Sequence, residues 1–96
     1  MTNLTLQNYP LEVEQAGLPV LICVHAANTP PTEAVEQLCA SRLKCCCLDA
    51  SEEEELVQKF RVLRLPSALL VQNGQIVQRI QGERSLHDLA NILNLN

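Results

Sequence analysis

The chain has 96 residues, enough for one domain (residues 1–96) around a single core, and its 47% apolar content excludes a disordered chain. Only 2% of the residues are aromatic and the net charge is −4, which excludes a stacking platform or a basic surface for nucleic acid. No apolar run is long enough to span a membrane or has the basic flank of a signal peptide, so we expect a cytoplasmic protein that contacts no membrane.

The first elements in chain order are predicted to be a strand, a helix and a second strand. Leu4–Gln7 alternates apolar and polar residues, as a short edge strand does. Pro10 suits the first turn of a short helix ending at Gly17, because a first turn needs no amide donor at that position. Val20–Val24 is a continuous apolar run rich in β-branched residues, which indicates a strand buried on both faces.

A second helix, a third strand and a third helix follow. Thr29 is a suitable N-cap for the second helix. The apolar residues of that helix recur at helical spacing: Ala34, Val35, Leu38 and Leu43. Cys45–Leu48 is a short apolar run, predicted as a strand that ends at Asp49. Ser51 and Glu54 have the spacing of a capping box, which places four consecutive glutamates at the positive end of the third helix.

The last part of the chain predicts a hairpin and a terminal helix. Leu69–Gln72 and Gln75–Gln81 flank Asn73-Gly74, the preferred residue pair of a type I′ turn. Ser85 caps the last helix. Its apolar stripe consists of Leu86, Leu89, Ala90 and Leu93. The order β-α-β-α-β-α-β-β-α predicts an α/β fold with one central mixed sheet and helices on both faces.

Three blocks of the sequence, in this order, resemble the thioredoxin family. The first is Val20–His25, a buried strand that runs into a proline-bearing turn, and the second is Cys45–Asp49, a strand ending in Asp before a helix. The third and most specific is Phe60–Gln75, with Gly82 after the last strand. The resemblance covers roughly residues 18–95 and implies a thioredoxin-like fold.

The chain departs from the family at the active turn. Thioredoxins carry Trp-Cys-Gly-Pro-Cys-Lys there. The matching residues in this chain include no cysteine: Asn28, Thr29, Pro30, Pro31, Thr32 and Glu33. Disulfide exchange needs an attacking thiolate and a second thiol, and a threonine hydroxyl can replace neither. We therefore expect no dithiol active site at this turn.

One feature of the family is kept. Pro66 matches the cis-proline that faces the active turn, and the resemblance implies that Leu65 offers backbone groups to an extended partner chain. Binding without catalysis is one interpretation, and a purely structural role of Pro66 is the other. The first predicts a redox-inactive adaptor or chaperone-like module that binds a protein partner, or a second copy of itself, through Asn28–Thr32 with Leu65 and Pro66. A structural subunit of a larger assembly would have the same sequence.

The five cysteines suggest an alternative function, a thiol-based redox protein or sensor. The family's buried acid falls on Cys23 and its lysine partner on Cys45, so the resemblance implies that these two thiols lie close together, buried and reduced. Cys39 lies on a predicted helix three residues before Arg42, whose charge favours a thiolate. No cysteines have C-x-x-C spacing and the two histidines are far apart, so we expect neither a metal nor another cofactor.

Overall fold

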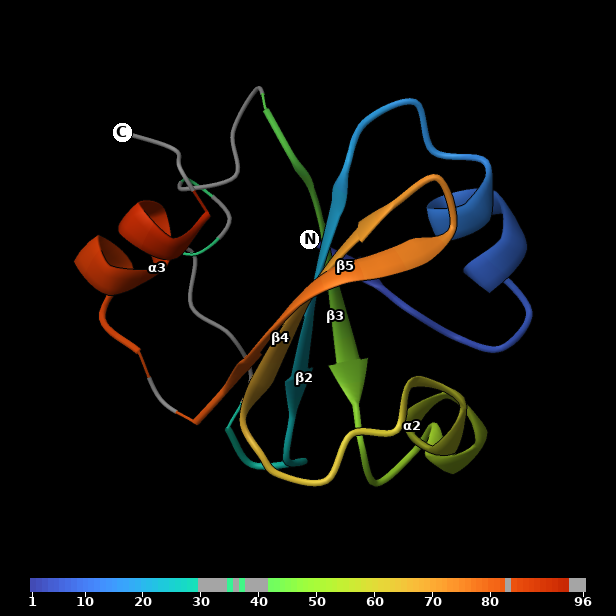
Figure 1. The fold of residues 1–96 in the computed structure, drawn as a ribbon. Coiled ribbons are helices and arrows are strands. Elements are labelled where there is room, and N and C mark those ends of the chain that lie inside the picture. The colour runs from blue at the N-terminus through green and yellow to red at the C-terminus, as the bar shows by residue number, and fades with distance from the viewer. Residues whose placement is uncertain (30–34, 36, 38–41, 83, 94–96) are drawn as a thin grey trace.

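The computed structural model describes residues 1–29, 35, 37, 42–82 and 84–93. Its strands are β1 (Thr2–Asn3), β2 (Val20–His25), β3 (Lys44–Asp49), β4 (Ser67–Gln72) and β5 (Gln75–Gln81). They form one sheet in the order β1-β3-β2-β4-β5, with β1, β3 and β2 parallel and the β2–β4 and β4–β5 pairs antiparallel. In Figure 1, η1 (Pro10–Glu14) and α2 (Glu54–Phe60) lie on one side of the sheet and α3 (Leu86–Ile92) on the other. The predicted mixed sheet with helices on both faces is confirmed.

Side-chain alternation along the central strands divides the core between the two faces of the sheet. Ile22 and Leu48 point to the face covered by η1 and α2, where they pack in one cluster with Leu56. Leu21 points to the opposite face and packs in a second cluster with Leu89 of α3. Because both faces of β2 and β3 are buried, the ends of these strands are held in fixed positions.

The N-terminal strand lies earlier in the chain than predicted. β1 consists of Thr2–Asn3 and pairs with β3, whereas the predicted strand Leu4–Gln7 runs into a turn. In that turn the Thr5 N–H donates to Asn8 Oδ1 at 2.8 Å, and the Asn8 N–H donates to Thr5 Oγ1 at 3.1 Å. These reciprocal bonds satisfy the backbone locally and so compete with the strand ladder.

The short helix predicted from Pro10 is present, but it is a π-helix and ends at Glu14, before the predicted end. The Gln15 N–H donates to the Pro10 carbonyl at 3.0 Å, which is the i to i+5 bond of that helix type. Most of the helix predicted after Thr29 lies outside the described residues. Val35, which is described, packs against the cluster on the α3 face.

The third predicted helix is confirmed as α2, but its predicted cap is wrong. The Ser51 hydroxyl donates to Asp49 Oδ1 at 2.6 Å, and the helix begins after Glu53 without a side-chain cap. A hydrogen bond to a charged carboxylate is stronger than a bond to a neutral backbone N–H. The Ser51 hydroxyl therefore bonds to Asp49, two residues away, and does not cap the helix. The helix ends where Arg61 adopts the left-handed conformation, with φ of 55°.

The hairpin and the last helix form as predicted. Asn73 and Gly74 have φ of 54° and 77°, the two positive values that a type I′ turn requires. Ser85 caps α3, because its Oγ accepts a hydrogen bond from the Asp88 N–H at 3.1 Å. The described part of the apolar stripe is buried: Leu89, Ala90 and Leu93.

Candidate functional site

The candidate site lies at the edge of the sheet where β2 ends and β4 begins. β2 and β4 are antiparallel with Val24 opposite Ser67, so the residues that follow β2 and those that precede β4 emerge at the same edge. Both connections lie at the lower end of the sheet in Figure 1. Asn28 and Thr29, the first two residues of the predicted binding turn, are exposed there. The other three residues of this turn lie outside the described residues: Pro30, Pro31 and Thr32.

Leu65 and Pro66 directly precede β4 at this edge. The peptide bond between them is cis, and the Pro66 carbonyl accepts a hydrogen bond from the Gly82 N–H at 2.8 Å, which ties it to the end of β5. The Leu65 side chain is 41% exposed. Its backbone N–H and C=O form no hydrogen bond with any other residue that the structure describes. Toward the described part of the chain, Leu65 therefore offers one donor and one acceptor without a partner, as an unpaired strand edge does.

His25 and Asp49 are neighbours at the ends of β2 and β3. His25 is buried, and its Nδ1 lies 2.7 Å from the Ala26 carbonyl oxygen. Because a carbonyl can only accept, Nδ1 carries the proton and Nε2 is the nitrogen with the free lone pair in the neutral ring. The hydroxyl and the N–H of Ser51 donate to Asp49 Oδ1, and these bonds, with a smaller effect of His25, hold the pKa of Asp49 below its ordinary value.

A cavity of about 240 Å³ opens beside these two residues. The polar residues that line it include Asn3, His25, Cys47, Asp49, Glu52 and Glu53. The Cys47 thiol donates to Asn3 Oδ1 at 2.8 Å. Within the described ranges, no three His, Cys, Asp or Glu side chains are grouped so that they could hold a metal ion. The cavity therefore provides an acidic, polar surface near the turn.

The strand register makes different cysteines neighbours from those predicted. Cys23 lies opposite Cys47 in the β2–β3 register, and Cys45 lies opposite Leu21. Cys47 is not among the predicted site residues. Counting two residues back from the adjacent strand ends, His25 and Asp49, identifies Cys47 as the neighbour of Cys23, because parallel strands keep their register along the pair.

The prediction that Cys23 and Cys45 form a reduced, buried pair is wrong. Both are only partly buried, and both pack against the cluster on the α3 face. Cys23, Cys46 and Cys47 are free thiols, whereas Cys45 is disulfide-bonded, so its disulfide involves none of the other cysteines that the structure describes. Cys39, the other predicted thiol site, lies outside the described residues.

Two of the free thiols, Cys23 on β2 and Cys46 on β3, are poor nucleophiles. Burial, with a further contribution from Cys47, raises the pKa of Cys23 to about 12. Burial likewise raises the pKa of Cys46 to about 11. The thiolate is the form that attacks a disulfide, so neither group can replace the missing nucleophile of the turn at neutral pH.

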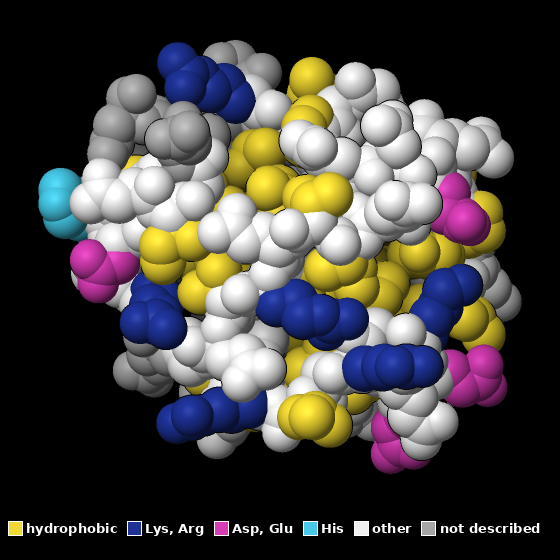
Figure 2. Space-filling model, viewed as in Figure 1, with side chains coloured by type: hydrophobic (Ala, Val, Ile, Leu, Met, Phe, Trp, Pro, Cys, Tyr) yellow, Lys and Arg dark blue, Asp and Glu magenta, His cyan; other side chains and the backbone are white. Residues whose placement is uncertain are grey.

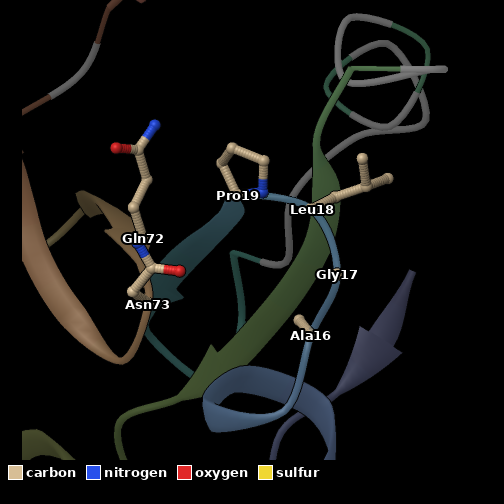
Figure 3. A pocket seen from close by; sticks show the side chains of 6 residues that line it. All are labelled: Ala16, Gly17, Leu18, Pro19, Gln72 and Asn73. Carbon is tan, nitrogen blue, oxygen red and sulfur yellow. The ribbon is translucent and has the colours of Figure 1, made fainter.

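A second pocket, of about 130 Å³, lies at the opposite end of the sheet (Figure 3). Ala16, Gly17, Leu18 and Pro19 form one wall before β2, and Gln72 and Asn73 of the β4–β5 turn form the other. These side chains are apolar or carry neutral amides, and none of them can act as a nucleophile or transfer a proton. The polar cavity and the exposed Leu65 therefore remain the features that define the candidate site.

Comparison with known proteins agrees with this geometry. No described helix is long and apolar enough to cross a membrane. No curated protein matches the chain closely enough to count as a relative. The family model described as Thioredoxin, however, matches residues 2–95, a range that includes all five strands and the edge formed by Leu65 and Pro66. The chain therefore belongs to the thioredoxin family.

Proposed function

We propose that this chain is a redox-inactive binding module that holds an extended segment of a protein partner against Leu65 and Pro66. Thr29 and Thr32 stand where the family has its two cysteines, so the attacking and resolving thiols of disulfide exchange are both missing. The observation that carries the proposal is that the backbone of the exposed Leu65 forms no hydrogen bond with any described residue. An extended partner can pair with such groups by adding a strand, and its side chains then meet the turn at Thr29.

The loss of redox activity is tested by reduction of insulin disulfides. We expect the wild-type chain to reduce no more insulin than a heat-denatured sample does, with an active thioredoxin as the positive control. The cysteines of the chain serve as an internal check, because each can be replaced by serine. Turnover at a rate typical of a thioredoxin, lost on replacing any one cysteine, would contradict the proposal.

Binding is tested by capturing a partner with the native chain, identifying it by mass spectrometry and measuring the affinity of the purified pair by calorimetry. Thr29→Asp places a charge in the turn and should weaken binding at least about tenfold, the effect expected of a central interface position. Gln75→Glu adds the same charge at the opposite end of the sheet and should leave the affinity within about twofold. Unchanged affinity of Thr29→Asp, with an unchanged circular dichroism spectrum, would remove this edge as the binding site.

The disulfide of Cys45 favours a second function, a thiol-based sensor. A sensor requires that this disulfide be reduced and reformed within the range of cellular glutathione potentials. We would measure its reduction by mass spectrometry over that range, and compare the partner affinity of Cys45→Ser with that of Cys23→Ser, which removes a free thiol of the same sheet face. An affinity that changes with reduction and with Cys45→Ser alone would support the sensor, and equal affinities would exclude it.

A further inference from the structure

The loop between α2 and β4 exposes basic and apolar side chains in alternation. Arg61, Leu63, Arg64 and Leu65 are all exposed, and Leu63 is 90% exposed. A single exposed leucine is common on protein surfaces. Here two leucines alternate with two arginines within five residues of a chain whose net charge is −4. The loop therefore differs in both charge and polarity from the chain as a whole.

Arg79 on β5 adds a third guanidinium group beside this loop. Its Nη1 donates to the Phe60 carbonyl at 2.6 Å, which fixes it at the C-terminal end of α2, next to Arg61. Arginine has five N–H donors, so this bond leaves most of them available. The lower part of the face in Figure 2 shows dark-blue basic side chains around yellow hydrophobic ones. We call this the arginine–leucine surface, and it consists of Arg61, Leu63, Arg64, Leu65 and Arg79.

The positive charge of this surface is not neutralised from within the described part of the chain. None of the three arginines forms an ion pair with a described residue, and the described ion pair, Lys44 with Glu12, lies at the start of β3. The four glutamates of residues 52–55 lie at the other end of α2, about 10 Å away along a helix of this length. Arg61 and Arg79 lie at the C-terminal end of α2 and Arg64 follows three residues after Arg61, so this part of the surface attracts a negatively charged ligand.

We propose that the arginine–leucine surface binds an acidic, extended segment of the partner protein. The inference rests on the proposed function, because Leu65 belongs to both surfaces. Arginine and carboxylate groups form paired, charge-assisted hydrogen bonds, and the exposed Leu63 provides contact area for an apolar side chain of the segment. The backbone groups of Leu65, which bond to no described residue, suit a peptide. The five residues of the surface include no aromatic side chain on which a nucleic acid base could stack.

The test uses three fluorescent peptides of equal length, in which valine alternates with glutamate, with glutamine or with lysine. Their binding to the full chain is measured by fluorescence anisotropy at about 20 and about 200 mM salt, concentrations between which screening of exposed charges increases strongly. We expect the glutamate peptide alone to bind, and its affinity to fall roughly tenfold at the higher salt concentration. Equal binding of the glutamine peptide, or no binding of the glutamate peptide, would overturn the inference.

Charge-matched variants locate the binding site. Arg64→Glu should weaken binding of the glutamate peptide at least about tenfold, since it replaces an attraction by a repulsion. Arg42→Glu changes the net charge equally but lies before β3, at the opposite end of the sheet, and should leave binding within about twofold. Leu63→Ser should weaken binding several-fold without changing the salt dependence. Equal effects of the two arginine variants would show that only net charge matters, which would overturn the inference.

The outcomes separate this inference from the proposed function. If the glutamine peptide binds as tightly as the glutamate peptide and Thr29→Asp weakens both, the proposed function is supported and the acidic preference is wrong. If Arg64→Glu weakens binding and Thr29→Asp does not, the acidic preference is supported and the turn is not part of the site. Equally tight binding of a single-stranded oligonucleotide, or self-association that Arg64→Glu abolishes, would assign the surface to another ligand and overturn the inference.

Discussion

Cys23 illustrates how a cysteine on a central strand loses its reactivity. Its side chain packs against the cluster on the α3 face, where a thiolate would be poorly solvated. Burial is the main cause that raises the pKa of Cys23 to about 12, and burial also raises the pKa of Cys46 to about 11. At neutral pH both groups are therefore almost entirely protonated, and a protonated thiol attacks neither disulfides nor alkylating reagents.

We predict that Cys23 and Cys46 stay unmodified when the native chain is treated with iodoacetamide at neutral pH, and react fully once denaturant is added. Alkylation is quantified for each cysteine by mass spectrometry of the digested chain. The denatured sample is the control for reagent activity. Stoichiometric alkylation of either residue in a chain that is still folded would contradict the burial argument.

The pKa of Asp49 predicts how stability depends on pH in acid. The Ser51 hydroxyl and N–H lower this pKa in the folded chain, so the unfolded chain takes up a proton at a higher pH than the folded chain does. The stability that these bonds provide is present above the ordinary pKa of 3.8 and is lost as the pH falls through the lowered value. In urea unfolding between neutral pH and about pH 3, Asp49→Asn and Ser51→Ala should each lose less stability on acidification than the wild type. If both variants lose as much stability on acidification as the wild type does, the hydrogen bonds of Asp49 contribute nothing to the pH dependence of stability.

At the scale of secondary structure, elements set by local chemistry were the predictable ones. Asn73 and Gly74 specify their turn because both tolerate positive φ, and Ser85 caps α3 with its own side chain. Ser51 failed as a predicted cap because Asp49, at the end of a neighbouring strand, competes for the same hydroxyl. That competition depends on the conformation of the chain after β3, and the spacing of residues alone does not reveal this conformation.

At the C-terminal end of α2, the backbone of Arg61 adopts an unfavourable conformation. Arg61 has φ of 55°, a left-handed conformation that glycine adopts without the steric cost borne by other residues. We predict that Arg61→Gly increases the free energy of unfolding by about 0.5–1 kcal/mol, measured by urea denaturation. Lys59→Gly, inside the same helix, is the matched control and should destabilise by about 1 kcal/mol. Destabilisation by both variants would mean that the Arg61 side chain contributes more than its backbone costs.

At the scale of the whole molecule, the parts of the site that could not be predicted are those that depend on tertiary contacts. The resemblance to thioredoxins implied that Pro66 faces the turn, and in the structure β2 and β4 are neighbouring strands, so that Leu65 and the turn emerge at the same edge of the sheet. The proximity of Cys23 to Cys47 depends on strand register, and the proximity of Arg79 to the end of α2 depends on a single bond across 19 residues. The contact of Arg79 with α2 leaves no pattern in the spacing of residues along the chain, whereas the contact of Cys23 with Cys47 can be found by counting only once His25 and Asp49 are known to be neighbours.

The core and the arginine–leucine surface use different leucines, and this difference predicts how substitutions change the stability of the fold. Leu56 of α2 is fully buried in the cluster that joins α2 to the sheet, whereas Leu63, seven residues later, is 90% exposed. Leu56→Ala removes buried contacts and leaves a cavity, so it should lower the free energy of unfolding by about 2–5 kcal/mol. Leu63→Ala should change it by no more than about 0.5 kcal/mol.

The two leucine variants, measured by urea denaturation, also distinguish folding from binding. Leu63→Ala should keep the native circular dichroism spectrum while it weakens binding of the glutamate peptide, because the side chain serves only the arginine–leucine surface. Leu56→Ala should reduce binding only in proportion to the fraction of chain that is unfolded, since the residue is 0% exposed and cannot touch a ligand. A large loss of stability in Leu63→Ala would show that the loop leucine belongs to the core, and its role in binding would then lose its basis.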